Sequence, residues 1–182
     1  DSDTDTDTDT DADLPSNACA TGSQSRSGCD DARVIGRGEA YTFYEVESNT
    51  CNDDDEFSSD CGSLWSMGND HVYAIYVLAG ETVDVEVEAK TTDCSSGAEL
   101  NGRVRLYRND DTSAAGAASC PVELSCWGGP SPGSTSYRSH TATQDGWLFW
   151  VVDGGAPAWD EHEGYYRLRV ELTGCLEASC GC

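Results

Sequence analysis

The sequence predicts an all-β protein: an antiparallel jelly-roll-like β-sandwich with disulfide-pinned loops and an extended N-terminal arm. Two observations predict the sandwich. Apolar residues recur with period two along about seven short segments, and turns rich in Gly, Asp and Asn separate those segments. The third observation is the ten cysteines in 182 residues, which indicate long loops held by disulfides.

The expected strands follow one another from residue 40 to the end of the domain. They are residues 40–46, 71–78, 82–89, 103–108, 134–142, 147–153 and 165–172. Alternation decides which side chains face inward. The inward set is Val83, Val85, Val87, Val104, Leu106, Tyr166, Leu168, Val170 and Leu172, and the outward set includes Asp84, Glu86 and Glu88.

Two of these strands, residues 71–78 and 147–153, are apolar on both faces. A two-layer sandwich buries only one face of each strand. The second face must therefore be covered by the chain's own long loops, by a partner, or by a sugar stacked on aromatic rings. For a binding surface made of rings, the candidates are Trp127, Trp150 and Trp159.

The cysteines indicate an oxidising compartment, because a reducing cytosol would keep them as thiols. A metal cluster needs closely spaced cysteine pairs, and only Cys180 and Cys182 lie closer than five residues apart. The pairing cannot be deduced from the sequence. The expected disulfide-forming residues are Cys19, Cys29, Cys51, Cys61, Cys94, Cys120, Cys126, Cys175, Cys180 and Cys182.

The net charge of −24 comes from 34 acidic and ten basic residues. Such a chain repels nucleic acid and anionic membranes, and it attracts divalent cations. No run approaches 18 apolar residues, so no transmembrane segment is expected. The sequence begins with Asp1 rather than Met, which fits a mature form whose export signal has been removed.

Residues 1–13 alternate Asp with Ser or Thr for most of their length. As a strand, this arm would place its acids on one face and its hydroxyls on the other. A flexible stalk is one interpretation. Strand donation to a neighbouring copy is the favoured one, because main-chain hydrogen bonds provide affinity for almost any sequence. The donated residues would be Asp3, Thr4, Asp5, Thr6, Asp7, Thr8, Asp9 and Thr10, and the threonines Thr4, Thr6, Thr8 and Thr10 are candidates for O-glycosylation.

Four motifs in order resemble the bacterial pre-peptidase C-terminal (PPC) domain over residues 70–172. They are LAGETVDVEV (Leu78 to Val87), RVRLYRNDD (Arg103 to Asp111), GWLFWVVDGG (Gly146 to Gly155) and GYYRLRV (Gly164 to Val170). The resemblance implies a small secreted bacterial β-sandwich with a role in folding, secretion or binding, in some members with calcium in acidic loops. No catalytic domain of the kind that usually accompanies such a domain is expected within these residues.

Composition and the resemblance together divide the chain into four parts. These are an acidic arm at 1–15, Cys-rich loops with one strand at 16–69, a PPC-like sandwich at 70–174 and a Cys-rich tail at 175–182. The arm, the loops and the tail are not part of the family's pattern.

Acidic loops are the places where a cofactor could bind, and calcium is the cofactor that suits them, because Ca²⁺ takes six to eight oxygen ligands. The candidate ligands are Asp153, Asp160, Glu161 and Glu163. A second acidic run, residues 52–56 with Asp60, lacks the EF-hand spacing. A solvated loop is the plainer interpretation of both.

No enzyme is expected. The sequence contains no GxSxG, HExxH, P-loop or GxGxxG motif, and His71 and His140 fall in predicted strands. Paired carboxylates could hydrolyse glycosides only if they faced each other across a cleft. We expect a secreted or cell-surface structural protein whose partner is other copies of itself in a fibre or filament. The alternative is a non-catalytic module that binds an extracellular glycan or protein, with calcium as a possible requirement.

Overall fold

The computed structural model describes residue 29 and residues 32–37, 42–51, 66–93, 103–109, 122–155 and 164–174. The N-terminal arm, the acidic run at 52–60, Trp159 and the acids at 160–163 lie outside the described residues, as does the C-terminal tail. The division of the chain into four parts therefore stays a prediction.

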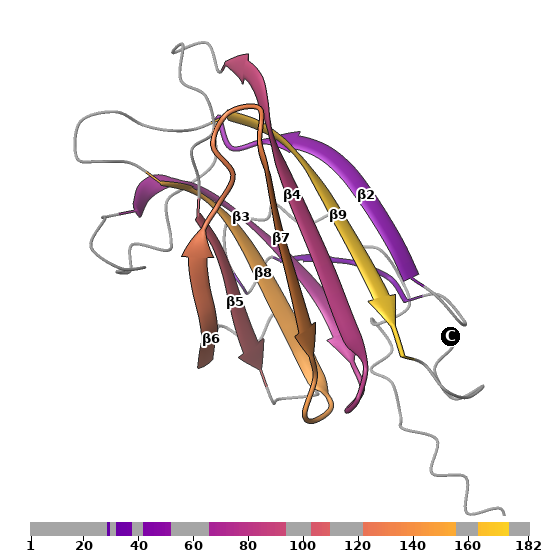
Figure 1. Cartoon of the computed structure of the whole chain (residues 1–182). Helices are drawn as coiled ribbons and strands as arrows, with labels where there is room; N and C mark the ends of the chain where they lie inside the picture. Colours follow the sequence, from indigo (N-terminus) through magenta and orange to yellow (C-terminus); the bar gives the residue numbers. More distant parts are fainter. Residues whose placement is uncertain are drawn as a thin grey trace, which may run out of the picture.

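The described residues form nine strands in two sheets (Figure 1). The five-stranded sheet has the order β1 (Arg33–Val34), β3 (Ser66–Val77), β8 (Gly146–Gly155), β5 (Arg103–Asn109) and β6 (Val122–Gly128). The four-stranded sheet has the order β2 (Thr42–Asn49), β9 (Gly164–Thr173), β4 (Thr82–Asp93) and β7 (Thr135–Thr141).

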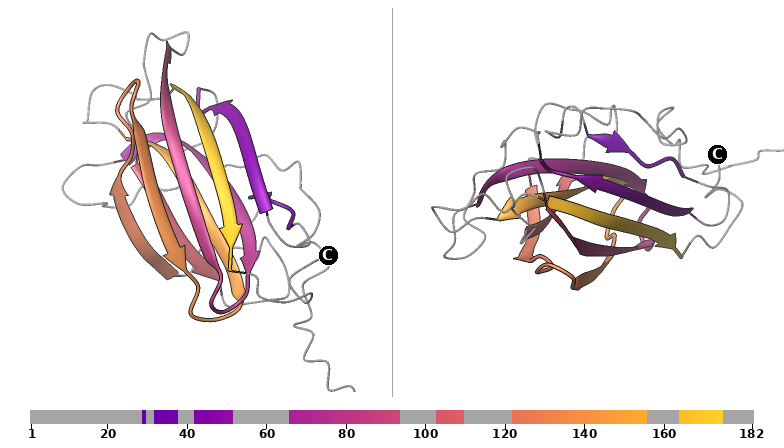
Figure 2. Two further views of the ribbon diagram at one scale, coloured as in Figure 1. Left: turned by 45° about the vertical axis from the view of Figure 1, so that its right-hand side comes forward. Right: turned by 90° about the horizontal axis from the view of Figure 1, so that it is seen from above.

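The two sheets stack as layers, as the view from above in Figure 2 shows. All strand pairs are antiparallel except β1 with β3, which is parallel. Strands β2 to β9 supply four strands to each sheet, the number in a double-sheet jelly roll. The prediction of an all-β, two-sheet sandwich is confirmed. Within the described residues no helix is long and apolar enough to cross a membrane.

The main core lies between the sheets and consists of the side chains that alternation places inward. Every inward residue predicted for β4, β5 and β9 is buried. On the five-stranded sheet, Leu148, Trp150 and Val152 of β8 face the same core. Trp150 is fully buried there and is therefore not available to a ligand at the surface, contrary to its proposed place in an aromatic binding surface.

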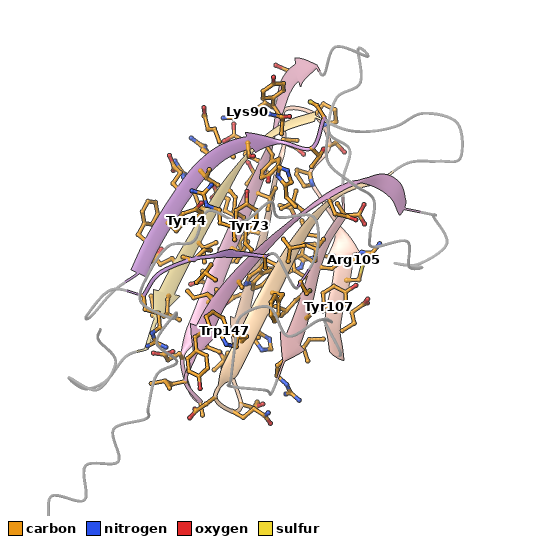
Figure 3. The ribbon with its side chains drawn as sticks, turned by 180° about the vertical axis from the view of Figure 1, so that it is seen from behind. Tyr44, Tyr73, Lys90, Arg105, Tyr107 and Trp147 are labelled. Carbon is orange, nitrogen blue, oxygen red and sulfur yellow. The ribbon has the colours of Figure 1, made fainter. Side chains whose placement is uncertain are left out.

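A second apolar cluster covers the outer face of β3 and β8. Its buried side chains are Val72, Ala74, Tyr76, Tyr107, Trp147, Phe149 and Val151, together with Cys29, Ala32 and Val34. Figure 3 shows this side of the molecule, with Arg105, Tyr107 and Trp147 labelled. Of the three covers that the sequence left open, the structure shows parts of the chain itself, Cys29 and the segment of residues 32–37, packed on this face through Cys29, Ala32 and Val34.

The covering segment is fastened by a buried ion pair. Arg37 donates to both carboxylate oxygens of Glu81, at 3.0 and 2.7 Å, and to the carbonyl of Tyr76 at 3.0 Å. Glu81 also accepts a hydrogen bond from the backbone N–H of Leu78 at 2.7 Å. Glu81 therefore ties the turn between β3 and β4 to the segment that covers the outer face.

Two strands were not predicted. β1 has only two residues, and β6 (VELSCWG) lacks a clean alternation and carries a register shift against β5 between Leu106 and Tyr107. The described residues include three cysteines, Cys29, Cys51 and Cys126, and each is disulfide-bonded rather than a free thiol. No pairing between two cysteines is defined within the described residues, so the connectivity stays open.

Candidate functional site: the outer face of the four-stranded sheet

The outer face of the four-stranded sheet is polar, and strand register arranges its side chains in rows across the four strands. One row runs Glu45, Arg169, Glu86 and Tyr137. The next row runs Phe43, Glu171, Asp84 and Ser139. Opposed residues on one face lie within reach of each other's side chains. The register therefore collects residues from four distant parts of the sequence on one surface.

Two aromatic rings stand at the margins of these rows. Phe43 on the edge strand β2 is 53% exposed, and Tyr137 on the edge strand β7 is 54% exposed. Between them lies a shallow, open hollow of about 220 Å³, lined by Phe43, Asp84, Glu86, Tyr137, Arg169 and Glu171. This is less than the roughly 300–1,000 Å³ of a pocket that encloses a drug-sized ligand. A ligand would therefore lie across the face.

Arg169 lies at the centre of the face and is held from both sides. Its Nε donates to Glu45, and its Nη1 donates to Glu86 at 3.2 Å. The hydrogen bond with Arg169 lowers the pKa of Glu45, and the same bond raises the pKa of Arg169. Glu45 and Arg169 are therefore both charged at neutral pH. The Nη2 of Arg169 makes no hydrogen bond within the described residues and remains available to a ligand.

The Tyr137 ring is oriented by its hydroxyl, which donates to Asp84 at 2.6 Å. This hydrogen bond raises the pKa of Tyr137, with the charge of Asp84 acting in the same direction. The ring is thus fixed on the face while more than half of the residue is exposed. Such a side chain offers an apolar surface to a ligand, and it loses little conformational entropy on binding because it has few rotatable bonds.

A third row continues the charged pattern beyond the hollow. Arg167 donates to Glu88, and Lys90 lies 3.2 Å from Glu88 and 3.6 Å from Glu47. The hydrogen bond from Lys90 is the main cause that lowers the pKa of Glu88, with Arg167 contributing. Basic and acidic residues are therefore interleaved over the whole face, and its apolar surface is concentrated in the rings.

The predicted calcium ligand Asp153 lies elsewhere, on the outer face of the five-stranded sheet. It is fully buried, and its carboxylate accepts from Arg105 Nη2 at 2.7 Å. Burial lowers the pKa of Arg105, but Tyr107, Asp153 and Asp70 together raise it above its usual value. Asp153 therefore serves a buried ion pair. Its proposed partners Asp160, Glu161 and Glu163 lie outside the described residues, within which no group of three or more metal-binding side chains occurs.

Of the two proposed aromatic residues that the structure describes, Trp127 is partly accessible and Trp150 is buried. Its Nε1 donates to Ser136 at 3.2 Å, its ring meets Trp150 edge-on, and the Arg138 guanidinium lies 5.0 Å from its centroid. Trp159 lies outside the described residues. The exposed rings Phe43 and Tyr137 were missed. The alternation of residues 42–49 and 135–141 was the available signal, because it places both rings opposite the core.

The two described histidines are structural. His71 Nδ1 shares a hydrogen bond with the hydroxyl of Tyr166, which also lies 2.7 Å from the hydroxyl of Tyr73. This chain of polar groups joins the two sheets inside the core. His140 lies on the inner side of β7, where burial, aided by Arg108, lowers its pKa. Neither lines the hollow.

Fold and surface together define the described part of the chain as an all-β, two-sheet sandwich module. No family model matches the sequence, and no curated protein matches it. Among solved structures, the chain is similar to the pre-peptidase C-terminal domain of a collagenase from Bacillus anthracis, with 16% identity and a TM-score of 0.43 over 76% of this chain and 93% of that one. That solved structure is a domain of the family that the strand motifs resemble.

Two further solved structures are similar. A periplasmic inhibitor of g-type lysozyme from Aeromonas hydrophila has 10% identity and a TM-score of 0.37 over 75% of this chain and 89% of that one. The K3 cleaved adhesin domain of Lys-gingipain from Porphyromonas gingivalis has 11% identity and a TM-score of 0.41 over 71% and 74%. At these identities the likeness concerns the fold and says nothing about ligand or activity.

Proposed function

We propose that this chain is an extracellular, non-catalytic binding module, and that the outer face of its four-stranded sheet binds a neutral glycan. One observation carries the proposal. Two exposed rings, Phe43 and Tyr137, frame a hollow whose floor supplies the fixed donor Arg169 and several fixed carboxylates. Apolar rings together with a few polar groups in fixed positions suit a ligand that has both apolar faces and hydroxyls, as sugars do.

Charge favours a neutral ligand. The chain has a net charge of −24, and the three rows of the face carry six acids against three bases: Glu45, Glu47, Asp84, Glu86, Glu88 and Glu171 against Lys90, Arg167 and Arg169. An anionic polysaccharide would be repelled. A large protein interface normally has an apolar core, and here the rings are separated by charged side chains.

The spacing of the rings favours an extended ligand. Three strand intervals of about 4.8 Å and an offset of two residues separate Phe43 from Tyr137, roughly 16 Å between their Cα atoms. This exceeds the width of a single sugar ring. The ligand that contacts both rings is therefore an oligosaccharide or a polysaccharide chain.

The same geometry supports binding without catalysis. Hydrolysis of a glycoside needs one carboxyl group whose pKa is raised so that it can act as an acid. In the hollow, Asp84 is engaged by Tyr137 and Glu86 by Arg169, and the neighbouring Glu45 has a lowered pKa. The carboxylates of the face thus act as hydrogen-bond acceptors.

The experiment is affinity electrophoresis of the full chain through gels that contain neutral polysaccharides: glucans, mannans, xylans and soluble chitin derivatives. We expect retardation by at least one of them. Phe43→Ala and Tyr137→Ala should each weaken it about tenfold, because each removes a stacking surface. Tyr165→Ala is the matched control, since Tyr165 is 38% exposed on the same sheet but does not line the hollow. No retardation by any polysaccharide, or equal loss in the control, would refute the proposal.

The same gels test calcium, which stays a prediction. If Asp160, Glu161 and Glu163 hold Ca²⁺ that binding requires, EDTA abolishes the retardation. If EDTA has no effect, the glycan surface acts without a metal ion.

A further inference from the structure

The strand β7 is an open edge of the four-stranded sheet. Within the described residues its sheet partner is β4 alone. All seven residues of β7 are exposed or half-exposed. An edge strand leaves one row of N–H and C=O groups without ladder partners, and such a row is a template for another strand.

The ladder shows which backbone groups of β7 face outward. Ala142 N–H donates to Glu81 at 2.8 Å, and Ala89 N–H donates to Ser134 at 3.0 Å; in the register of this pair, both bonds join directly opposed residues. Hydrogen-bonded pairs alternate along an antiparallel ladder. The even-numbered residues of β7 are therefore bonded to β4. The N–H and C=O groups of Thr135, Tyr137, Ser139 and Thr141 face the open edge, where the Tyr137 carbonyl already accepts a hydrogen bond from Arg138 Nη1 at 2.8 Å.

The side chains of β7 alternate in chemistry. On the outer face of the sheet stand the hydroxyls of Thr135, Tyr137, Ser139 and Thr141. On the other face stand Arg138 and His140, with Ser136 before them. Arg138 is exposed, and its guanidinium lies over the ring of Trp127 at 5.0 Å. One face of this edge thus presents the positive charge of Arg138 beside the half-buried His140, and the other presents hydroxyls.

The other edge strands of the described residues differ. β2 carries Glu45 and Glu47 on its exposed face, β6 carries Glu123, and β1 has only two residues. An acidic segment that adds a strand would meet like charges on β2 and β6. It would meet the positive charge of the exposed Arg138 on β7.

The chain contains a segment with the complementary pattern. From Asp3 to Asp11 its N-terminal arm alternates strictly between Asp and Thr. In an extended conformation the acids lie on one face and the threonines on the other. Beside β7, the acids would face Arg138 and His140, and the threonines would face the row of hydroxyls. A shift by one residue would turn the acids toward Asp84, Glu86 and Glu88 of β4, so charge selects one register.

We propose that the open edge of β7 accepts the N-terminal arm of a second copy of the chain as an added strand. Main-chain hydrogen bonds to the four outward-facing residues hold the arm, and the match of charges sets its register. Each copy then has one donor arm and one acceptor edge. Such a head-to-tail contact grows into a ring or an open filament. The glycan surface is not required for this contact, so either proposal can fail without the other.

The first experiment is sedimentation of the full chain over a range of concentrations. We expect reversible association that weakens with salt. Arg138→Glu should weaken it about tenfold, because an attractive cross-strand pair becomes repulsive. Lys90→Glu, which changes the net charge equally but lies on β4, is the matched control. Asp5→Lys with Asp7→Lys should restore association to the Arg138→Glu variant. A chain that is monomeric at every concentration, or equal effects of the two Glu variants, would overturn the proposal.

Two further measurements test the strand itself. A synthetic peptide of residues 1–13 should dissociate the full-length assembly, whereas a peptide of the same composition with its Asp and Thr residues in two blocks should not. Hydrogen exchange should slow on association at Thr135, Tyr137, Ser139 and Thr141, while Ser136, Arg138 and His140 are protected in both states. Equal competition by the two peptides would contradict the register. Protection of the same four amides at every concentration would contradict donation by a second copy.

Discussion

Removal of the Glu81 carboxylate should be one of the most damaging single changes to the fold. Glu81 is 2% exposed, accepts two hydrogen bonds from the Arg37 guanidinium, and accepts one from the backbone N–H of Leu78. Glu81→Ala leaves a buried guanidinium without that carboxylate. Breaking a buried pair by removing one partner costs about 3–5 kcal/mol. With an m-value of roughly 2 kcal/mol/M, the urea midpoint should fall by about 2 M.

Equilibrium urea unfolding, followed by tryptophan fluorescence with the disulfides intact, measures this change. The control is Glu86→Gln, which breaks the partly exposed ion pair with Arg169 and should leave the midpoint almost unchanged. The double variant Arg37→Leu with Glu81→Leu should recover much of the stability, because the uncompensated charge is gone. A Glu81→Ala midpoint within error of the parent would refute the assigned role of this ion pair in holding residues 32–37.

Two further stability predictions follow from the core and from β7. Tyr166→Phe removes the hydroxyl that His71 and Tyr73 share, and should lower the free energy of unfolding by about 1–3 kcal/mol in urea titrations. Tyr137→Phe, which removes an exposed hydroxyl, is its control, and an equal loss would contradict the inter-sheet role. The pKa of His140 lies below its ordinary value of 6.5, so the unfolded chain binds the proton more readily. Stability should therefore fall as the pH drops through 6.5 toward the folded pKa, and His140→Gln should flatten that fall; an unchanged slope would contradict it.

The sandwich could be predicted because each strand obeys a local rule. In β4, Val83, Val85 and Val87 alternate with acids, and the structure buries the valines and exposes the acids to the outer face. The strands β3 and β8, apolar on both faces, predicted a second cover, and the segment with Cys29 and Val34 supplies part of it. The local pattern could not identify the residues that form this cover, because they are determined by packing between parts of the chain that are distant in the sequence.

The candidate site was harder to predict than the fold. Tryptophan is a common residue type in binding surfaces, yet the alternation of β8 points Trp150 into the core, where it is fully buried. Phe43 and Arg169 are 126 positions apart in the sequence. They lie on the same surface because β2 pairs with β9. Register between distant strands is a tertiary property. A hollow built from four strands therefore has no local signature.

Binding at the outer face of the four-stranded sheet should be detectable residue by residue. The most direct test is an NMR titration of the isotopically labelled full chain with the neutral polysaccharide fragment that binds it best. Binding at this face should shift the signals of Phe43, Glu86, Tyr137, Arg169 and Glu171, in four different strands, and change that of Tyr165 little. Shifts confined to the five-stranded sheet, or the absence of any shift at saturating ligand, would contradict it.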